Sequence, residues 1–393
     1  MEQYLIRNGR LILPQGIVSG DILTADGVIQ EIAGNGQIEA PNATMIDAQG
    51  CYVSPGFIDI HTHGAAGYDF MDASQEGVEA ACKAHLHHGT TSIMPTTVTS
   101  TKESLLAITD FFEQLGLKKR GNAEILGLHL EGPYFAKNQR GAQDETYLRN
   151  PDPEEYREVL QRTERVRRWS FAIELAGAAD LMDACHKRGI VTSLAHSDAT
   201  CEEVMQAHEK GLSALTHFYS CMASVRRVNA YRVAGAVEAG YLLDDLYVEV
   251  IADGCHLPEH LLQLIYKVKR PDRICLVTDS CRAATMPDGE YILGNEQEGQ
   301  RIIVEDGVAK LPDRTAFAGS VATMDRLVRT FLKATNAPLD QVIRMASLNP
   351  AMLAGVSDRK GSLEVGKDAD ILIFDDNILM QTVMVRGIVV EQS

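Results

Sequence analysis

The chain has 393 residues, with 37 Lys and Arg against 54 Asp and Glu, which gives a formal net charge of −17 at pH 7. This acidic balance argues against nucleic acid or an anionic membrane surface as the main partner, because phosphate-rich ligands require cationic faces. A hydrophobic share of 45% excludes a disordered or fibrous chain. The length predicts two or three domains, or one large barrel with an appendage.

Signals for membrane insertion or secretion are not found in this sequence. The apolar stretches fall well short of the ~20 residues that a membrane-spanning helix needs, and residues 1–4 lack the cationic and apolar regions of a signal peptide. The eight cysteines are scattered without a CxxC pair, which favours buried, reduced thiols over a disulfide framework or a zinc knuckle. These features predict a cytoplasmic protein.

The sequence pattern at both ends of the chain predicts short β-strands separated by turns. The expected strands cover residues 4–7, 17–23, 27–32 and 44–47 near the start, and 369–374 and 380–391 near the end. Because chain ends commonly lie close together, we expect residues 1–54 and 350–393 to form one small β-sandwich domain.

The middle of the chain alternates short apolar runs with stretches of helical period, a pattern typical of βα units in a parallel sheet. Expected strands are residues 56–63, 92–98, 125–131, 170–175, 190–196, 214–218, 246–253 and 274–279. Expected helices are residues 77–88, 102–115, 153–163, 181–188, 201–210 and 258–266.

This pattern predicts an α/β protein in which residues 55–349 form a (β/α)8 TIM-type barrel. An open doubly wound sheet is the alternative, but no GxGxxG follows the first strand of this region. The turns Asp288-Gly289 and Asp306-Gly307 predict a β-hairpin insertion over residues 282–315.

Polar side chains gather where these strands end, at the face of a barrel that carries active sites. With a strand period of two, His61 and His63 point to one face, where two imidazoles can bind one divalent metal. A single histidine at a strand end is more often structural, but here several metal-ligand types would converge at one barrel mouth. They are His61, His63, Glu131, His196, His217 and Asp279. Their convergence predicts a metal-assisted hydrolase.

Several motifs resemble known families. Residues 55–64 (PGFIDIHTHG) match the opening motif of the amidohydrolase superfamily, and residues 127–134 (GLHLEGPY) resemble N-acetylglucosamine-6-phosphate deacetylases. So do residues 195–200, 251–256, 276–279 and 318–320, whereas residues 347–351 and 361–370 are generic to the superfamily. The resemblance covers essentially the whole chain, and the motif around Glu131 is the discriminating one.

The resemblance implies a role for each strand-end residue. Glu131, His196 and His217 match the family's metal ligands, and Asp279 matches its catalytic acid and base. His61 and His63 match a pair that completes a second metal position in some members. One or two divalent ions are therefore expected, and both Zn²⁺ and Fe²⁺ accept mixed imidazole and carboxylate ligands.

The implied reaction is hydrolysis of an N-acetylated amino sugar, most simply N-acetylglucosamine 6-phosphate, to acetate and the free amino sugar. The metal would acidify a water molecule. Asp279 would take a proton from that water as it attacks the acetamide, and would pass the proton to the departing nitrogen.

Three departures from the family pattern concern the substrate. Gln143 stands where the family has a histidine, residues 220–222 read Ser-Cys-Met in place of Asn-Ala-Met, and the family's phosphate-binding Arg-Glu-Pro-Gly is absent. Arg226, Arg227 or Arg232 would have to supply that contact as bidentate donors, or they are surface charges on a different loop. The expected substrate residues are Ala142, Gln143, Ser220, Cys221, Arg227, Asp253, His256, Phe317, Ala318 and Gly319.

Other readings remain open at the level of sequence. The substrate is alternatively the 6-phosphate of the galacto epimer or a non-phosphorylated sugar. A hydantoinase or dihydroorotase would share the barrel, but residues 169–175 lack the lysine that bridges two metals in those enzymes. A metal-free barrel acting as a binding module is the rival from another class, although such relatives lose the ligands that this chain keeps. Resemblance implies a homodimer.

Overall fold

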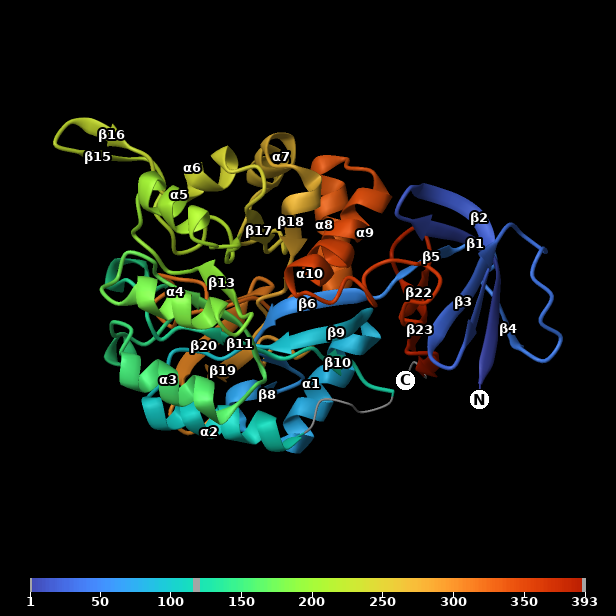
Figure 1. Ribbon diagram of the computed structural model, residues 1–393, viewed down its shortest axis with the longest axis horizontal. Coiled ribbons are helices and arrows are strands. Elements are labelled where there is room, and N and C mark those ends of the chain that lie inside the picture. Colours follow the sequence, from blue (N-terminus) through green and yellow to red (C-terminus); the bar gives the residue numbers. More distant parts are fainter. Residues whose placement is uncertain (1, 116–120, 391–393) are drawn as a thin grey trace.

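The computed structural model describes residues 2–115 and 121–390. Its larger part is built on parallel strands with helices outside them, and its smaller part is a β-sheet that contains both ends of the described chain (Figure 1). No helix within these ranges has the length and apolar character needed to cross a membrane. Glu391, the last residue of the strand expected over 380–391, lies outside the described residues.

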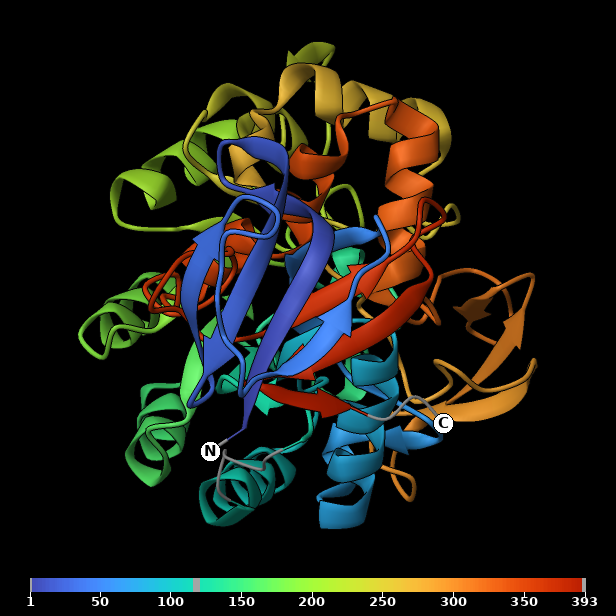
Figure 2. The same cartoon turned by 90° about the vertical axis from the view of Figure 1, so that its right-hand side faces the viewer.

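The smaller part is one connected sheet of eight strands, in the order β24-β23-β22-β5-β1-β2-β3 with β4 beside β1. Strands from the two ends of the chain lie side by side (Figure 2), and β22 pairs antiparallel with β5. The chain ends thus pair as the sequence predicts, while a sandwich of two sheets stays a prediction. The strands are β1 (Gln3–Leu13), β2 (Gly16–Ala25), β3 (Val28–Ala33), β4 (Thr44–Asp47), β5 (Tyr52–Pro55), β22 (Ile371–Phe374), β23 (Met380–Val385) and β24 (Ile388–Val390).

The larger part contains two parallel sheets, β10-β9-β6 and β11-β12-β13-β14-β17-β18. Residues of β6 are buried on both faces, as expected for a parallel strand covered by helices. The strands are β6 (Phe57–Thr62), β9 (Thr90–Pro95), β10 (Glu124–Ile125), β11 (Leu128–Glu131), β12 (Val166–Phe171), β13 (Val191–Leu194), β14 (Ala214–Leu215), β17 (Tyr247–Val250) and β18 (Ile274–Leu276).

The strand expected over residues 125–131 is divided into β10 and β11, which pair with different neighbours. Gly127 lies at the break with φ of +148°, and a Cβ there would lie 2.8 Å from the Arg165 carbonyl oxygen. Only glycine adopts this backbone readily, so the ladder changes partner at this point. The two sheets meet through a bridge between Thr96 and His129 and a 2.8 Å hydrogen bond from Asp279 N to His61 O.

Helices follow the parallel strands, and each of the six expected ones is present within a few residues of its predicted bounds. Helix α5 begins where Thr200 and Glu203 cap each other's backbone N–H groups. Helices α6, α8, α9 and α10 are additional to the prediction. The helices are α1 (Gln75–His87), α2 (Lys102–Leu115), α3 (Pro153–Arg162), α4 (Ala178–His186), α5 (Cys201–Glu209), α6 (Ala236–Leu242), α7 (Glu259–Val268), α8 (Met324–Thr335), α9 (Leu339–Ala346) and α10 (Leu348–Leu353).

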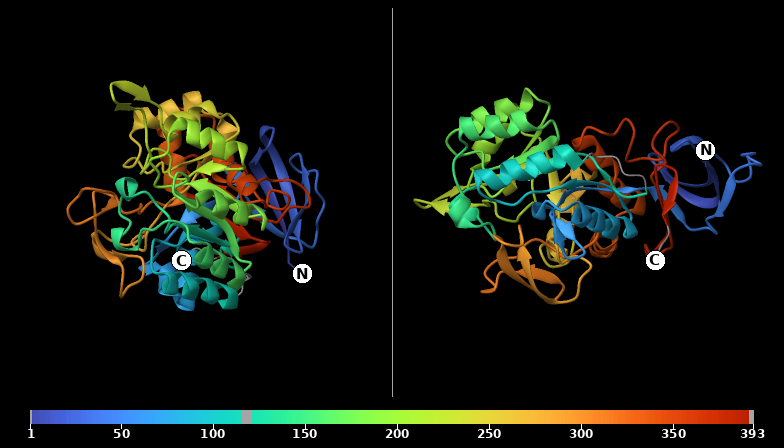
Figure 3. Two further views of the ribbon diagram at one scale, coloured as in Figure 1. Left: turned by 60° about the vertical axis from the view of Figure 1, so that its left-hand side comes forward. Right: turned by 90° about the horizontal axis from the view of Figure 1, so that it is seen from below.

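Two small β elements extend from this body (Figure 3). The expected hairpin at 282–315 is a three-stranded antiparallel sheet of β19 (Gly289–Leu293), β20 (Gln300–Glu305) and β21 (Val308–Lys310). The hairpin of β15 (Arg226–Val228) and β16 (Tyr231–Val233) projects as an arm, and Tyr231 on it is 78% exposed. A short pair, β7 (Gly64–Ala65) and β8 (Tyr68–Asp69), follows β6.

A buried ion cluster joins the terminal sheet to the parallel strands. The Lys360 ammonium is 1% exposed and lies 2.5 Å from Asp370 Oδ2, 2.9 Å from Asp368 Oδ2 and 3.1 Å from Glu124 Oε2. Burial alone would lower the pKa of Lys360, but these three carboxylates raise it above the usual value, so the ammonium stays charged. Glu124 belongs to β10, whereas the two aspartates precede β22.

The Lys360→Met substitution is expected to lower the free energy of unfolding by about 3 kcal/mol, because it leaves the buried Asp370 carboxylate without its cation. Urea unfolding curves of the two proteins measure this difference. Lys333→Met on the exposed side of α8 is the matched control and should change stability by less than about 0.5 kcal/mol. Equal effects of the two substitutions would contradict a structural role for the cluster.

Candidate active site

Six side chains meet at the carboxyl ends of the parallel strands, as the sequence predicts. His61 lies within β6, His63 follows that strand, and Glu131 ends β11. The other three do not lie on strands, although the sequence predicts strands up to them. β13, β14 and β18 end two or three residues before His196, His217 and Asp279.

The backbone explains why these three strands are shorter than expected. His196, His217 and Asp279 have φ of +46°, +33° and +47°, in the left-handed region that residues with a Cβ rarely adopt. A strand ladder cannot continue through such a residue. Strained backbone of this kind clusters at functional sites, where the surrounding structure holds it in place.

Glu131, His196 and His217 form one compact group. Glu131 Oε1 lies 3.0 Å from His217 Nε2 and 3.3 Å from His196 Nε2, and the two nitrogens are 3.2 Å apart. All three side chains are buried. Each contributes one ligand atom within 4.8 Å of the others, which is a spacing that can hold a metal ion.

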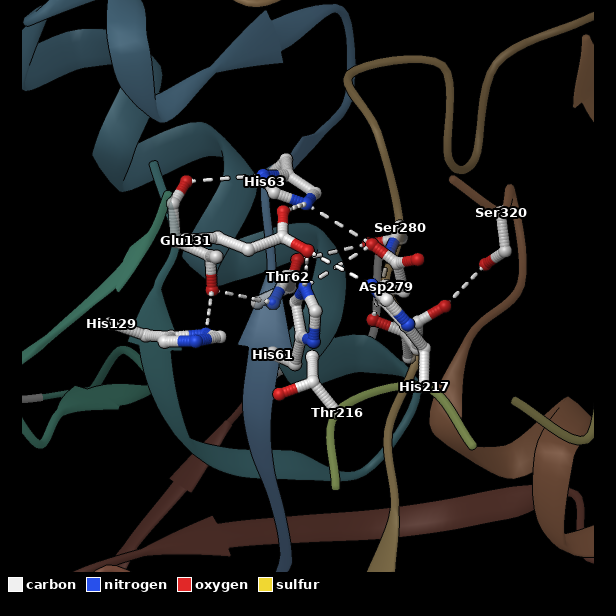
Figure 4. A network of polar contacts seen from close by, with 12 residues as sticks. His61, Thr62, His63, His129, Glu131, Thr216, His217, Asp279, Ser280 and Ser320 are labelled. Atoms are coloured by element: carbon white, nitrogen blue, oxygen red, sulfur yellow. Dashed lines mark hydrogen bonds and ion pairs between the residues drawn. The ribbon is translucent and has the colours of Figure 1, made fainter. Parts of the chain in front are cut away.

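His61, His63 and Asp279 form a second group beside the first (Figure 4). Asp279 Oδ1 lies 3.1 Å from His63 Nε2 and 3.4 Å from His61 Nε2. Glu131 connects the two groups, since its Oε2 is 3.4 Å from His63 Nε2 and its Oε1 is 3.7 Å from His61 Nε2. The six side chains therefore share one polar centre.

All four imidazoles are held in the same way, with Nδ1 on a protein oxygen and Nε2 facing the centre. The Nδ1 contacts are His196 to the Gln139 carbonyl (2.8 Å), His217 to the Ser220 carbonyl (3.1 Å), His63 to the Thr96 carbonyl (3.3 Å) and His61 to the Glu249 carboxylate (3.0 Å). A carbonyl or carboxylate accepts a proton from Nδ1, which leaves the Nε2 lone pair for another ligand.

Charges in the centre oppose the effect of burial. Burial would raise the pKa of Glu131, but His61, His196 and His217 lower it well below the usual value. Burial would likewise lower the pKa of His61, but the carboxylates around it raise it well above normal. The carboxylates thus remain ionised and favour positive charge at the position that the four Nε2 atoms face. A bound cation would supply that charge by displacing the Nε2 proton of His61.

The donor set fits a divalent cation. Imidazole nitrogens combined with carboxylate oxygens suit zinc, iron and other transition metals. His61 Nε2 is buried without a hydrogen-bond partner among the described residues, although it faces Glu131 and Asp279. An ion ligated by this nitrogen would satisfy it. The two groups provide ligands for one or two ions.

An open cavity of about 230 Å³ lies over this centre. Seven of the expected substrate residues line it: Ala142, Gln143, Ser220, Cys221, His256, Phe317 and Gly319. Three do not. Ala318 is fully buried, Asp253 lies behind His256 and accepts its Nδ1 proton at 2.8 Å, and Arg227 lies on the β15–β16 arm.

The cavity also has lining residues that sequence analysis did not identify. Val98, Leu293 and Ala316 are apolar and belong to no motif. Leu293 comes from the three-stranded insertion, so that sheet forms one wall of the cavity. Apolar residues in a loop or an inserted strand carry no local signal of a binding role.

Gln143 lines the cavity and is also hydrogen-bonded within the protein. Its Nε2 donates to Glu131 Oε2 at 3.1 Å, and its Oε1 accepts from the backbone N–H of Thr99 at 2.9 Å. Both ends of the amide are therefore used within the protein. Gln143 orients the central carboxylate, which is a role that a neutral side chain can perform.

Comparisons with known proteins agree with this geometry. A family model described as the amidohydrolase family matches residues 52–390. The chain is 34% identical to N-acetylglucosamine-6-phosphate deacetylase of Lysinibacillus sphaericus, covering 93% of this chain and 92% of that protein. It is 33% identical to the Homo sapiens protein of the same name, covering 100% and 92%.

Solved structures show the same similarity. N-acetylglucosamine-6-phosphate deacetylase from Pasteurella multocida superposes with a TM-score of 0.91 at 28% identity, over 99% of this chain and 100% of that one. A Mycobacterium smegmatis deacetylase mutant in complex with N-acetyl-D-glucosamine-6-phosphate gives 0.90 at 27% identity, over 100% of both chains. The class is that of the amidohydrolases, which are carbon–nitrogen hydrolases. The chain belongs to the amidohydrolase family and, within it, to the N-acetylglucosamine-6-phosphate deacetylase family.

The Glu131→Gln substitution is expected to weaken zinc binding more than tenfold, because it removes the ionised oxygen shared by both groups of ligands. Competition with a chromogenic chelator measures the zinc affinity of the two proteins. Glu164→Gln is the matched control, since that side chain is 86% exposed and belongs to neither group of ligands. Unchanged zinc affinity in Glu131→Gln would exclude this residue as a ligand.

Proposed function

We propose that this protein hydrolyses the acetamide of N-acetylglucosamine 6-phosphate, releasing acetate and glucosamine 6-phosphate. The observation that carries the proposal is the meeting of Glu131, His196 and His217 next to Asp279 on the floor of an open cavity. The names of the relatives supply the substrate.

Glu131, His196 and His217 would hold a divalent ion, zinc or iron, and His61 and His63 with Asp279 offer a second position. When bound, such an ion supplies a Lewis acid that acidifies water and polarises a carbonyl oxygen. The protein contributes the fixed aim of the Nε2 atoms and a cavity that places the acetamide next to Asp279.

Asp279 is the proposed catalytic acid and base. Burial would raise the pKa of its carboxyl group, but His61 and His63 lower it below the usual value. The group is therefore ionised at neutral pH and can accept a proton from the attacking water. The protonated carboxyl can then donate that proton to the amine nitrogen, which leaves poorly without it.

His256 is the best placed residue for a sugar hydroxyl. Its Nδ1 proton is bound to Asp253, so its Nε2 lone pair is available as an acceptor toward the cavity. The His256 and Phe317 rings lie 4.8 Å apart, centroid to centroid, which supports this wall of the cavity. Ser220 and Cys221 line the cavity beside His217 and would contact the same ligand.

The phosphate contact is proposed to come from a second copy of the chain. Arg226 donates a hydrogen bond to the Asp198 carbonyl at 3.0 Å. Arg227 on β15 lies opposite Arg232 on β16 in the antiparallel hairpin. The arm carries several cations on a chain of net charge −17, so it suits an acidic neighbour or a phosphate. In a homodimer Arg227 would reach the partner's cavity.

The frame is proposed to be a closed (β/α)8 barrel over residues 55–349, with the domain of residues 1–54 and 350–393 attached to it. The bridge between Thr96 and His129 and the bond from Asp279 N to His61 O join the edges of the two parallel sheets. They support closure on both sides.

Acetate release from a substrate panel tests the proposed function. The panel contains N-acetylglucosamine and N-acetylgalactosamine, each with and without a 6-phosphate, and the zinc-loaded protein is used. We expect the highest kcat/KM for N-acetylglucosamine 6-phosphate. Equal rates on phosphorylated and free sugars would refute the phosphate assignment, and a preference for the galacto sugar would refute the epimer.

The same substrate panel tests whether the β15–β16 arm contributes to substrate binding. Arg227→Ala should raise the KM of the phosphorylated sugars and leave the free sugars unaffected. Arg301→Ala, on the exposed side of β20, is the control and should change neither value. An Arg227→Ala protein with native KM for every sugar would remove this residue from the substrate site.

The Asp279→Asn substitution is expected to lower kcat by about 10²- to 10⁴-fold, because the amide neither accepts nor donates the proton. Steady-state acetate release measures kcat, while circular dichroism and zinc content check that the variant is folded and loaded. Asp272→Asn is the control, since this residue follows α7 and lies outside the cavity. Near-normal turnover in a folded, loaded Asp279→Asn protein would contradict the assignment.

A further inference from the structure

A buried ion pair lies under the polar centre, in the space enclosed by the parallel strands. Arg168 on β12 is 1% exposed and Glu249 on β17 is fully buried, and the Arg168 guanidinium contacts Glu249 Oε1. Inward positions of such strands usually carry bulky apolar residues. Since a buried ion pair often stabilises a fold less than apolar packing would, its presence here calls for another reason.

Glu249 connects this pair to the histidines above it. Its Oε2 accepts from His61 Nδ1 at 3.0 Å and from the backbone N–H of His217 at 3.0 Å. One oxygen thus contacts a member of each group of ligands. Among the described residues outside the six central ones, Glu249 is the carboxylate that links the two groups in this way.

Arg168 is itself fixed by the neighbouring strands. Its Nε donates to Ser193 Oγ at 2.9 Å and its Nη2 donates to Thr216 Oγ1 at 3.0 Å. These bonds hold the guanidinium against Glu249. Because arginine stays charged at all accessible pH, its contact keeps Glu249 as a carboxylate, which can only accept hydrogen bonds.

We propose that Glu249, held by Arg168, is a positioning residue that sets the tautomer and the aim of His61 and anchors the backbone of His217. An acceptor-only carboxylate requires the proton on His61 Nδ1, which leaves the Nε2 lone pair directed at the ion. The two groups of ligands are then held in register by a single side chain. The inference rests on the ion binding in the proposed function.

The neighbours of His61 do not offer a substitute for this contact. The His129 ring lies against His61 at 4.8 Å between centroids, edge to face, and its nitrogens are engaged by Ser170 and Thr96. Without Glu249, His61 Nδ1 would lack an acceptor. The proton could then move to Nε2, and that nitrogen could no longer bind an ion.

Two double variants separate positioning from the stability of the ion pair. Arg168→Met with Glu249→Gln and Arg168→Met with Glu249→Leu are both uncharged, but only glutamine keeps an oxygen for His61 Nδ1. We expect zinc affinity to be roughly 10- to 100-fold weaker in the leucine variant than in the glutamine variant. Equal affinities would overturn the proposal.

A matched control removes another buried pair. Lys360→Met with Asp370→Leu takes away a buried cation and carboxylate that contact no histidine, and we expect native zinc affinity. Loss of affinity there would mean that destabilisation alone weakens the site, and the proposal would fall. Acetate release by the unsubstituted protein is measured in parallel. Absence of acetate release would refute the proposed function, whereas the zinc affinities would still test the role of Glu249.

A measurement on the unsubstituted protein covers the case in which the leucine variant does not fold. Long-range ¹H–¹⁵N correlation spectra of the zinc-loaded protein report which imidazole nitrogen carries the proton, and His61→Asn assigns the His61 signals. We expect protonated Nδ1 in His61. A proton on Nε2 would overturn the proposal.

Discussion

The structure depends on how four imidazole rings are held through Nδ1 so that every Nε2 faces the carboxylates of Glu131 and Asp279. Three rings use backbone carbonyls and the fourth uses Glu249. A histidine held at one nitrogen has a defined tautomer and little freedom to rotate, so the centre is organised before a ligand arrives. The geometry requires backbone that a strand cannot provide, which is why His196, His217 and Asp279 lie just beyond strand ends in left-handed conformations.

Such a centre is costly for the fold, since it combines strained backbone with buried charge. The cost is offset by the apolar shell between strands and helices, where residues such as Trp169, Phe218 and Phe331 are almost fully buried. Burial of each large apolar side chain contributes about 1.5–3 kcal/mol. The Arg168–Glu249 pair extends the polar centre into the space enclosed by the parallel strands. The layer between these strands and the helices is apolar.

The proposed catalytic centre and the proposed sugar-binding wall of the cavity differ in how far they follow the family pattern. The centre brings together all six side chains that were expected there. Gln143, which stands where the resemblance implies a histidine, is hydrogen-bonded to Glu131, and the β15–β16 arm lies in the region where the resemblance implies a phosphate-binding motif. A carboxylate centre tolerates few changes because each atom has a partner, whereas an open cavity wall can change one contact at a time.

The sequence by itself determined the alternation of strands and helices and the identity of the six central residues, because period-two patterns and short motifs are local. The pairing of the chain ends was expected only from the general closeness of chain termini. Tertiary structure decided what depends on distant segments: the division of one expected strand at Gly127, the third strand of the insertion, and the left-handed turns at three central residues. Glu249 was not recognised, although a charge inside the apolar run of β17 is a signal that an inward-facing polar partner must exist. Its partners come from β6, β12 and the end of β14, and no local pattern links residues so far apart in the chain.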